Sequence, residues 1–312
     1  MPDAFDILGL GCAAVDELLY VDAYPAADSK QAIRRWERQC GGLTATALVA
    51  GARLGARCAY AGALGDDDLS RFVLQCLRQE GVDVGPVRRQ AEARPVHSVV
   101  VVDESQQTRT ILFDPAGAGE ATEDWPTEAT IRSARVLFLD HFGVPGMIRS
   151  ARLARVAGIP VVADLESADS PRFPELLALV DHLILSQSFA QRITGRTTPE
   201  AAVEHLWASA PRRSAVVTCG GDGCWYIAAD SPAAVCHQPA FAVEVVDTTG
   251  CGDVFHGAYA AAIARGQDIA TAIRFASASA ALKATCRGGQ AGIPTLAAVE
   301  TFLEQQPGRA RN

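Results

Sequence analysis

Residues 245–265 have the sequence VVDTTGCGDVFHGAYAAAIAR, which predicts a tight turn followed by a helix of small residues. Gly250 and Gly252 allow the backbone to turn sharply with its amides on one side. A helix that begins near Asp253 adds the positive end of its dipole at the same place. Together these features predict an anion hole suited to a phosphoryl group in transfer.

Asp253 lies at the mouth of this predicted anion hole. A carboxylate there can accept the proton of an attacking hydroxyl while the amides neutralise the charge that develops on a phosphate. Aspartate is also a common helix cap. The turn taken alone therefore leaves catalytic base and cap as equal alternatives for Asp253.

The sequence before this stretch predicts alternating strands and helices. Helical patterns end at Gly55, Gly81 and Gly158, where a glycine stop is expected just past a helix. Such alternation predicts an α/β fold with a central, mostly parallel sheet flanked by helices. The predicted strands are 6–10, 58–61, 98–102, 136–139, 161–163, 182–185 and 215–218, and the helices are 44–54, 69–79 and 147–156.

Two segments, 17–40 and about 90–114, interrupt this rhythm. In both, β-branched and charged residues alternate without a following helix, as in HSVVVVDESQQTRTILFD, with a hairpin connection near 104–108. We expect a small accessory sheet that serves as a lid over a substrate site. The alternative is a simple extension of the main sheet.

The composition disfavours several classes of function. The 312 residues carry a formal net charge of −8 and show no Lys/Arg stripe, which argues against nucleic acid and anionic membranes as partners. No apolar stretch reaches the roughly 18 residues of a membrane helix, and no basic region precedes the first apolar run, so we expect a cytoplasmic protein. Nine scattered cysteines favour reduced thiols, and we expect no metal site built from protein ligands.

A competing prediction comes from Gly9-Leu10-Gly11-Cys12-Ala13-Ala14, which follows a strand and matches the Gly-x-Gly-x-x-Ala of NAD-dependent oxidoreductases. A dinucleotide site needs a crossover helix directly after these glycines. The sequence that follows, DELLYVDAYPAADS, is short, contains Pro25 and is better explained as a lid strand.

The stretch DTTGCGDVFHGAY resembles the second signature of the PfkB carbohydrate kinase family, the ribokinase-like enzymes. The first signature is recognisable in GGLTATA at 41–47, so the resemblance covers nearly the whole chain. It implies one ribokinase-like, three-layer domain over residues 1–312 and ATP-dependent phosphorylation of a hydroxyl on a sugar-like substrate. Residues 237–294 look closest to a subgroup containing sulfofructose kinase, and the segments YPAADSK and TRTILFD look like ketohexokinase.

The resemblance also implies roles for individual residues. The catalytic group would be Asp253 as base, with anion-hole amides from Gly250, Cys251 and Gly252. Substrate contacts would come from Asp16, Gly41, Gly42 and Thr46 in the body, and from Asp28, Lys30 and Arg109 in the lid. ATP contacts would come from Thr218, Gly220 and Gly223 in a Thr-x-Gly-x-x-Gly turn, and from Thr248 and Ser277. A tight hairpin before Cys224 would also require these turn glycines.

The chain departs from the family pattern at two places. Many members have Asn-x-x-Glu at 186–189, where this chain has Ser-Gln-Ser-Phe, so Mg²⁺ would be held mainly through phosphates and water, with Asp164 or Glu166 as candidates to assist. A monovalent cation is a further candidate cofactor. Phe113 and Phe142 replace the Asn and Arg expected at a sulfonate, which disfavours sulfofructose.

Lys30 and Arg109 in the lid slightly favour a sugar acid over a neutral hexose. The alternative is that Lys30 points to solvent while Arg109 pairs with a lid acid such as Glu104. The open edges of the lid sheet predict a homodimer joined through the lid. A protein of this fold that binds sugar or nucleotide without turnover is a further alternative to the kinase.

Overall fold

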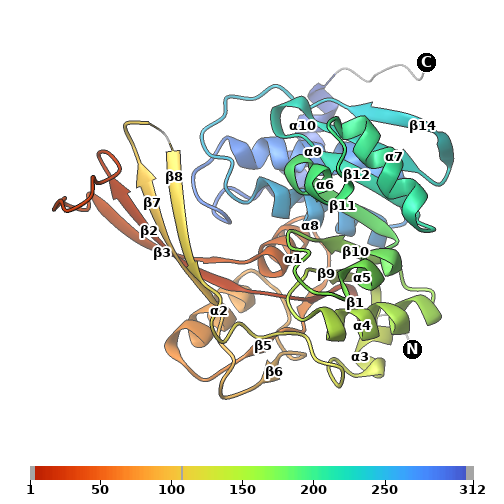
Figure 1. Cartoon of the computed structure of the whole chain (residues 1–312), viewed down its shortest axis with the longest axis horizontal. Coiled ribbons are helices and arrows are strands. Elements are labelled where there is room, and N and C mark those ends of the chain that lie inside the picture. The colour runs from red at the N-terminus through yellow and green to blue at the C-terminus, as the bar shows by residue number, and fades with distance from the viewer. Residues whose placement is uncertain (1–3, 107, 307–312) are drawn as a thin grey trace.

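The computed structural model describes residues 4–106 and 108–306 (Figure 1). Its main sheet contains eight strands in the order β14-β13-β12-β11-β10-β9-β1-β4. These strands are β1 (Phe5–Leu10), β4 (Cys58–Tyr60), β9 (Ala134–Leu139), β10 (Val161–Asp164), β11 (His182–Ser186), β12 (Ser214–Thr218), β13 (Cys224–Ala228) and β14 (Ser231–Gln238). Neighbours from β12 to β4 run parallel, whereas β13, at one side of the sheet, pairs antiparallel with both β12 and β14. The predicted α/β fold with a mostly parallel sheet is confirmed.

Helices cover both faces of this sheet because alternate residues along each strand point to opposite sides. Along β1, Ile7 packs into the core on one face and Leu8 into the core on the other. The first face carries α1 (Leu43–Arg53), α2 (Asp68–Gln79), α8 (Cys251–Ala264), α9 (Ile269–Ala284) and α10 (Leu296–Gln305). The second carries α3 (Glu128–Arg132), α4 (Val144–Val156), α5 (Phe173–Leu179), α6 (Gln187–Thr194) and α7 (Pro199–Ser209).

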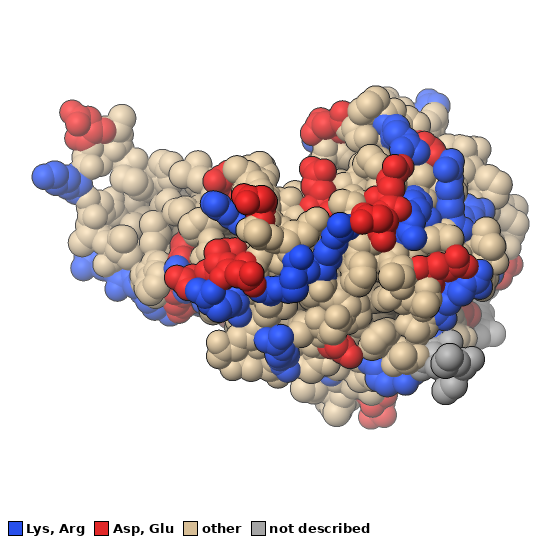
Figure 2. Space-filling view, turned by 90° about the horizontal axis from the view of Figure 1, so that it is seen from below, with Lys and Arg blue, Asp and Glu red and all other residues tan. Residues whose placement is uncertain are grey.

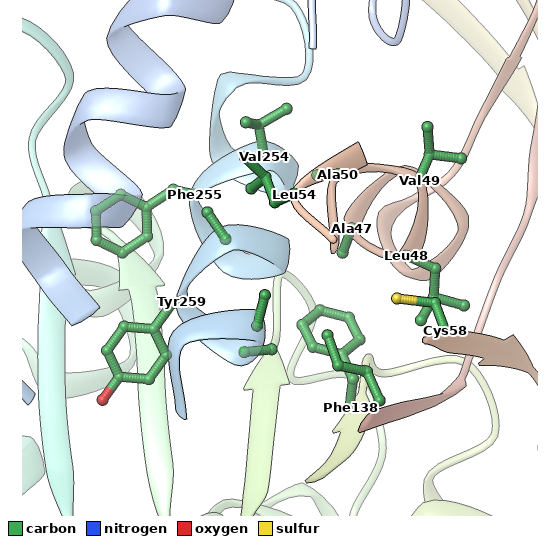
Figure 3. Close-up of a cluster of buried hydrophobic side chains, with 14 of the residues drawn as sticks. Ala47, Leu48, Val49, Ala50, Leu54, Cys58, Phe138, Val254, Phe255 and Tyr259 are labelled. Carbon is green, nitrogen blue, oxygen red and sulfur yellow. The ribbon is translucent and has the colours of Figure 1, made fainter. Parts of the chain in front are cut away.

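The small residues of α8 allow it to lie close against α1. Figure 3 shows Val254 of α8 beside Leu54 and Ala50 of α1. A Cβ added at Gly257 would lie only 2.1 Å from the carbonyl oxygen of Ala47. This close packing fixes the N-terminus of α8 against the central sheet, so the turn that precedes the helix rests on a rigid support.

A second, separate sheet forms where a lid was expected, is called the lid below, and projects from one side of the body (Figure 1). Its order is β3-β2-β7-β8, which makes β3 and β8 the two edges. The strands are β2 (Ala14–Val21), β3 (Arg35–Gly41), β7 (Val96–Asp103) and β8 (Thr108–Asp114). The predicted segments 17–40 and 90–114 contain all of this sheet except the first three residues of β2 and the last residue of β3. A third pairing, β5 (Ala63–Leu64) with β6 (Arg88–Arg89), was not predicted.

Strand β2 begins only four residues after β1 ends, so no crossover helix follows Gly9 and Gly11. Both glycines are required by packing instead. A Cβ at Gly11 would lie 2.1 Å from Asp140 Oδ2, and one at Gly9 would lie 2.6 Å from Leu48 Cδ1. The geometry of a dinucleotide-binding turn is absent here, and the oxidoreductase alternative has no support.

The surface view in Figure 2 shows acidic and basic side chains interspersed over the face seen from below, without a stripe of one sign. Among the described residues, no helix is both long enough and apolar enough to cross a membrane. The predicted helix stops are confirmed, because Gly55, Gly81 and Gly158 all adopt positive φ directly after their helices.

Candidate active site

The turn at 247–250 delivers the N-terminus of α8 to the carboxyl-terminal edge of the parallel strands. Gly250 is the N-cap of α8 with φ of 74°, and a Cβ there would lie 2.7 Å from the carbonyl oxygen of Gly289. Glycine is therefore required by conformation and by space. At Gly252, by contrast, a Cβ would meet no atom within 4 Å. Open space thus lies beside the first turn of α8, where a ligand would approach.

The first N–H groups of a helix have no acceptor within the helix. In α8 the N–H of Cys251 donates to the carbonyl of Thr248 at 3.2 Å, so this amide is already engaged. The N–H groups of Gly252 and Asp253 are the ones that helix geometry leaves for an anion. The geometry therefore favours Gly252 and Asp253 over Cys251 as amide donors.

Asp253 is the third residue of α8, and its partly buried side chain makes no capping hydrogen bond. Burial raises the pKa of Asp253 well above the ordinary value of an aspartate. The nearby carboxylates of Asp164 and Glu166 raise it further, and Asp16 and Asp140 act in the same direction. A perturbed carboxyl group at a helix N-terminus, without a capping role, is what a catalytic base requires.

Asp140 follows the end of β9 and is fully buried. Its Oδ2 accepts hydrogen bonds from the Cys12 amide at 2.6 Å and the Thr44 hydroxyl at 2.9 Å, and its Oδ1 accepts one from the Phe142 amide at 2.8 Å. Asp140 thus ties together the ends of β1 and β9 and the start of α1. The adjacent His141 is half-buried and lies against the Phe142 ring.

His256 lies one turn after Asp253 and is almost fully buried. Its Nδ1 lies 2.8 Å from the carbonyl oxygen of Gly252 and 3.3 Å from Asp164 Oδ2, while its Nε2 lies 3.1 Å from the carbonyl oxygen of Ile184. The ring therefore links the first turn of α8 to β10 and β11. Sequence analysis did not single out this residue.

The structure brings the predicted substrate residues Asp16, Gly41 and Gly42 together. Asp16 lies on β2, and a Cβ at Gly41 on the neighbouring β3 would lie 2.2 Å from Asp16 Oδ2. Gly42 caps α1 with φ of 95°, and a Cβ there would lie 2.6 Å from the Ala13 backbone. Burial raises the pKa of Asp16. The Asp16 carboxylate also raises the pKa of Asp253.

Of three other predicted substrate residues, two lie in the lid, and Thr46 lies one helical turn after Gly42. Asp28 and Lys30 are exposed in the loop between β2 and β3, at the end of the lid farthest from the body in Figure 1. Thr46 is buried in α1, and its hydroxyl accepts a hydrogen bond from Gln290 at 3.1 Å. The expectation that Lys30 and Arg109 face a common pocket stays a prediction.

Arg109 on β8 bridges the lid to the turn before α8. Its guanidinium donates to the Thr249 hydroxyl at 2.7 Å and lies 3.6 Å from Asp247 Oδ1. The predicted alternative, a pair between Arg109 and Glu104 of the lid, is not formed. The lid is instead fastened to the anion-hole turn itself.

The predicted ATP residues Thr218, Gly220 and Gly223 lie at the end of β12 and in the turn that follows it. Thr218 ends β12, and the residues Gly220–Asp222 form a single 3₁₀ turn. Gly223 is fixed by the hairpin, since a Cβ there would lie 2.1 Å from the Gln238 carbonyl oxygen, whereas one at Gly220 would meet open space. Thr248 is exposed ahead of α8, and Ser277 is buried on α9. The open glycine surface is therefore at Gly220 and not at Gly223.

Lys283 is a further residue of this region that sequence analysis missed. It is fully buried in the last turn of α9, and its ammonium donates to the backbone carbonyls of Asp247 at 2.9 Å and Cys286 at 3.2 Å. The signal that could have found it is its rarity, because Lys283 and Lys30 are the only lysines in the sequence.

Comparison with known proteins decides the family. Residues 10–296 match the family described as pfkB family carbohydrate kinase. The chain belongs to the PfkB carbohydrate kinase family. Fructokinase-1 of Oryza sativa subsp. japonica is 31% identical, with 85% of this chain and 88% of the relative covered. Ribokinase of Staphylococcus aureus is 25% identical, with 92% and 96% covered.

The structure is similar to that of a putative ribokinase from Agrobacterium tumefaciens, with a TM-score of 0.86 and 30% identity over 96% of this chain and 99% of the other. The predicted ribokinase-like fold is confirmed. As a PfkB carbohydrate kinase, the protein is an ATP-dependent sugar kinase, which confirms the predicted activity.

Proposed function

We propose that residues 1–312 act as one kinase domain in which Asp253 is the general base. The observation that carries this proposal is the position of Asp253: it is not a cap, its pKa is raised, and it lies beside two free helix amides and the substrate-side pair of Asp16 and Gly41. A sugar hydroxyl placed between Asp16 and Asp253 gives its proton to the Asp253 carboxylate as its oxygen attacks the terminal phosphorus of ATP. The bond between that phosphorus and the bridging oxygen breaks, and ADP leaves.

The protein groups in this step bind and stabilise charge. The N–H groups of Gly252 and Asp253 and the positive end of α8 face the phosphoryl oxygens on which charge accumulates. The open surface at Gly220 and Gly221 is where the remaining phosphates can approach the backbone. Mg²⁺, when bound with ATP, neutralises phosphate charge, and the acids that raise the pKa of Asp253 most are Asp164 and Glu166.

For the acceptor, we propose a small sugar whose hydroxyls are held by Asp16 and the Gly41–Gly42 backbone. The expected preference for a sugar acid has little support, because the loop that carries Lys30 lies at the far end of the lid and Arg109 already pairs with Thr249 and Asp247. The nine cysteines are all unpaired thiols, as a reducing compartment requires, and we place the enzyme in the cytoplasm.

We also propose that two copies of the chain pair through their lids. Nine large apolar side chains of the described residues are strongly exposed, and six of them lie on the lid: Tyr24, Ile33, Trp36, Ile111, Leu112 and Phe113. Exposed apolar side chains along the open edges of a sheet favour association with a second, identical sheet.

The decisive experiment replaces Asp253 with Asn and measures ADP release with a panel of sugars. Asn keeps the size of the side chain but cannot take the proton, so we expect a loss of about 10²–10⁴-fold in kcat with ATP binding retained. Asp268→Asn is a matched control, since Asp268 caps α9 and Asn caps helices equally well. A loss below about tenfold in the Asp253 variant would remove the base assignment. An absence of ADP release by the natural protein with every sugar would favour a binding protein.

A further inference from the structure

Lysine is almost absent from this chain. Only two of its 28 basic residues are lysines, and one of them, Lys283, is fully buried. Arginine carries a planar guanidinium with five donors, whereas lysine ends in a compact point charge. The buried cation at position 283 is therefore the compact one of the two types.

The hydrogen-bond partners of Lys283 also favour a small cation at this position. Its ammonium donates to two backbone carbonyls, those of Asp247 and Cys286, at 2.9 and 3.2 Å. A dehydrated cation cradled by backbone carbonyl oxygens is the arrangement by which proteins hold monovalent metal ions such as K⁺. Burial lowers the pKa of Lys283, and the nearby Cys251 and Asp247 oppose that shift by favouring the charged form.

The ammonium lies where two loops meet behind the anion hole. The Asp247 carboxylate accepts hydrogen bonds from the Thr249 and Gly288 amides, both at 2.8 Å, and so joins the turn at 247–250 to the loop at 286–290. Gly250 packs against Gly289 at the same junction. The Lys283 charge also lowers the pKa of Cys251, against the larger effect of burial, so its field reaches the first residue of α8.

We propose that the ammonium of Lys283 takes the place of a monovalent cation, fixing the 247–250 turn and placing a permanent positive charge behind the anion hole. The proposal rests on the proposed role of this turn in phosphoryl transfer. It makes Lys283 a positioning residue and not a group that touches substrate. It implies that the natural enzyme needs no added K⁺, and that a variant without the ammonium acquires a need for a small cation.

The experiment compares the natural protein with Lys283→Ala and Lys283→Met in choline chloride, KCl and NH₄Cl at equal ionic strength. We expect the natural protein to release ADP at the same rate in all three salts, within about a factor of two. Lys283→Ala should lose about tenfold or more in choline, because it removes the charge-assisted hydrogen bonds to Asp247 and Cys286, and it should regain rate in K⁺ or NH₄⁺. Lys283→Met fills the space without a charge and should stay low in every salt.

Melting temperature provides a readout independent of turnover. K⁺ or NH₄⁺ should raise the melting temperature of Lys283→Ala relative to choline and leave that of the natural protein unchanged. This result would stand even if Asp253 proved not to be the base. Arg53→Met is the matched control: Arg53 donates to the carbonyls of Gln290 and Ile293 in the adjoining loop, and its loss should lower stability without creating a cation response.

Two results would overturn the proposal. One is activation of the natural protein by K⁺ of about tenfold or more, which would show that the site of the cation is elsewhere. The other is a Lys283→Ala protein that keeps the natural rate in choline, or that gains neither rate nor melting temperature from K⁺ or NH₄⁺. If both Lys283 variants fail to fold, the salt response of the natural protein still decides the question.

Discussion

At the scale of the single residue, the fold disfavours the ionised form of the Asp253 carboxyl group. Its pKa is raised by burial and by four neighbouring carboxylates. Between its unfolded and its folded pKa, the native state binds more protons than the unfolded state, so this group costs stability as pH rises through that window. Asp253→Asn removes the cost. We expect the variant to melt about 2 °C or more above the natural protein near pH 8, with the gain shrinking as pH falls. A variant that melts lower at pH 8 would contradict this electrostatic account.

The same shift predicts the acidic side of the pH–rate profile. Asp253 must be ionised to accept the hydroxyl proton, so kcat/KM should fall as pH drops through its raised pKa. The acid limb is then expected at a higher pH than the pKa of an ordinary aspartate, which is near 3.9. Measuring initial rates at low sugar concentration from pH 4.5 to 8 tests this. A rate that stays flat down to pH 4.5 would exclude Asp253 as the titrating base.

Residues of this site could be predicted from the sequence only where their role depends on neighbours close in the chain. Gly250 and Asp253 lie within one turn of each other, and the pattern around them was sufficient. Lys283 and Asp140 were not predicted as parts of the site because their bonds span 36 and 128 positions of the chain. No local pattern in the sequence indicates which backbone carbonyl or amide the folded chain places beside a buried charged group.

At the scale of the element, β8 is fastened to the turn before α8 through Arg109, which bonds to Thr249 and approaches Asp247. Arg109→Ala should loosen the lid. We expect KM for the preferred sugar to rise several-fold with kcat little changed, the pattern of lost uniform binding. Because Arg109 is already paired within the protein, the rise should be similar for neutral and acidic sugars. A rise confined to acidic sugars would instead show direct binding of the substrate by this side chain.

A suitable control for that variant is Arg196→Ala, which removes an exposed arginine between α6 and α7 and should leave KM unchanged. The lid strands themselves could be predicted because alternation of side chains is a local property. The direction of the loop between β2 and β3 could not be predicted, because it depends on how the lid sheet joins the body. Lys30 was therefore expected at the substrate and lies instead at the far end of the lid.

At the scale of the whole molecule, the lid carries most of the strongly exposed large apolar side chains while the body carries few. Open edges beside such side chains would expose a single chain to unspecific association, and pairing two lids would cover them.

We expect sedimentation to show a dimer at micromolar concentration. Phe113→Glu, at a lid residue 64% exposed, should shift the protein toward monomer, because a charge buried in a lid interface has no partner. Val156→Glu is the matched control, since Val156 is 79% exposed on α4 of the body and should leave the dimer intact. A natural protein that sediments only as monomer would overturn the proposed dimer. A dimer that survives Phe113→Glu and dissociates with Val156→Glu would place the interface outside the lid.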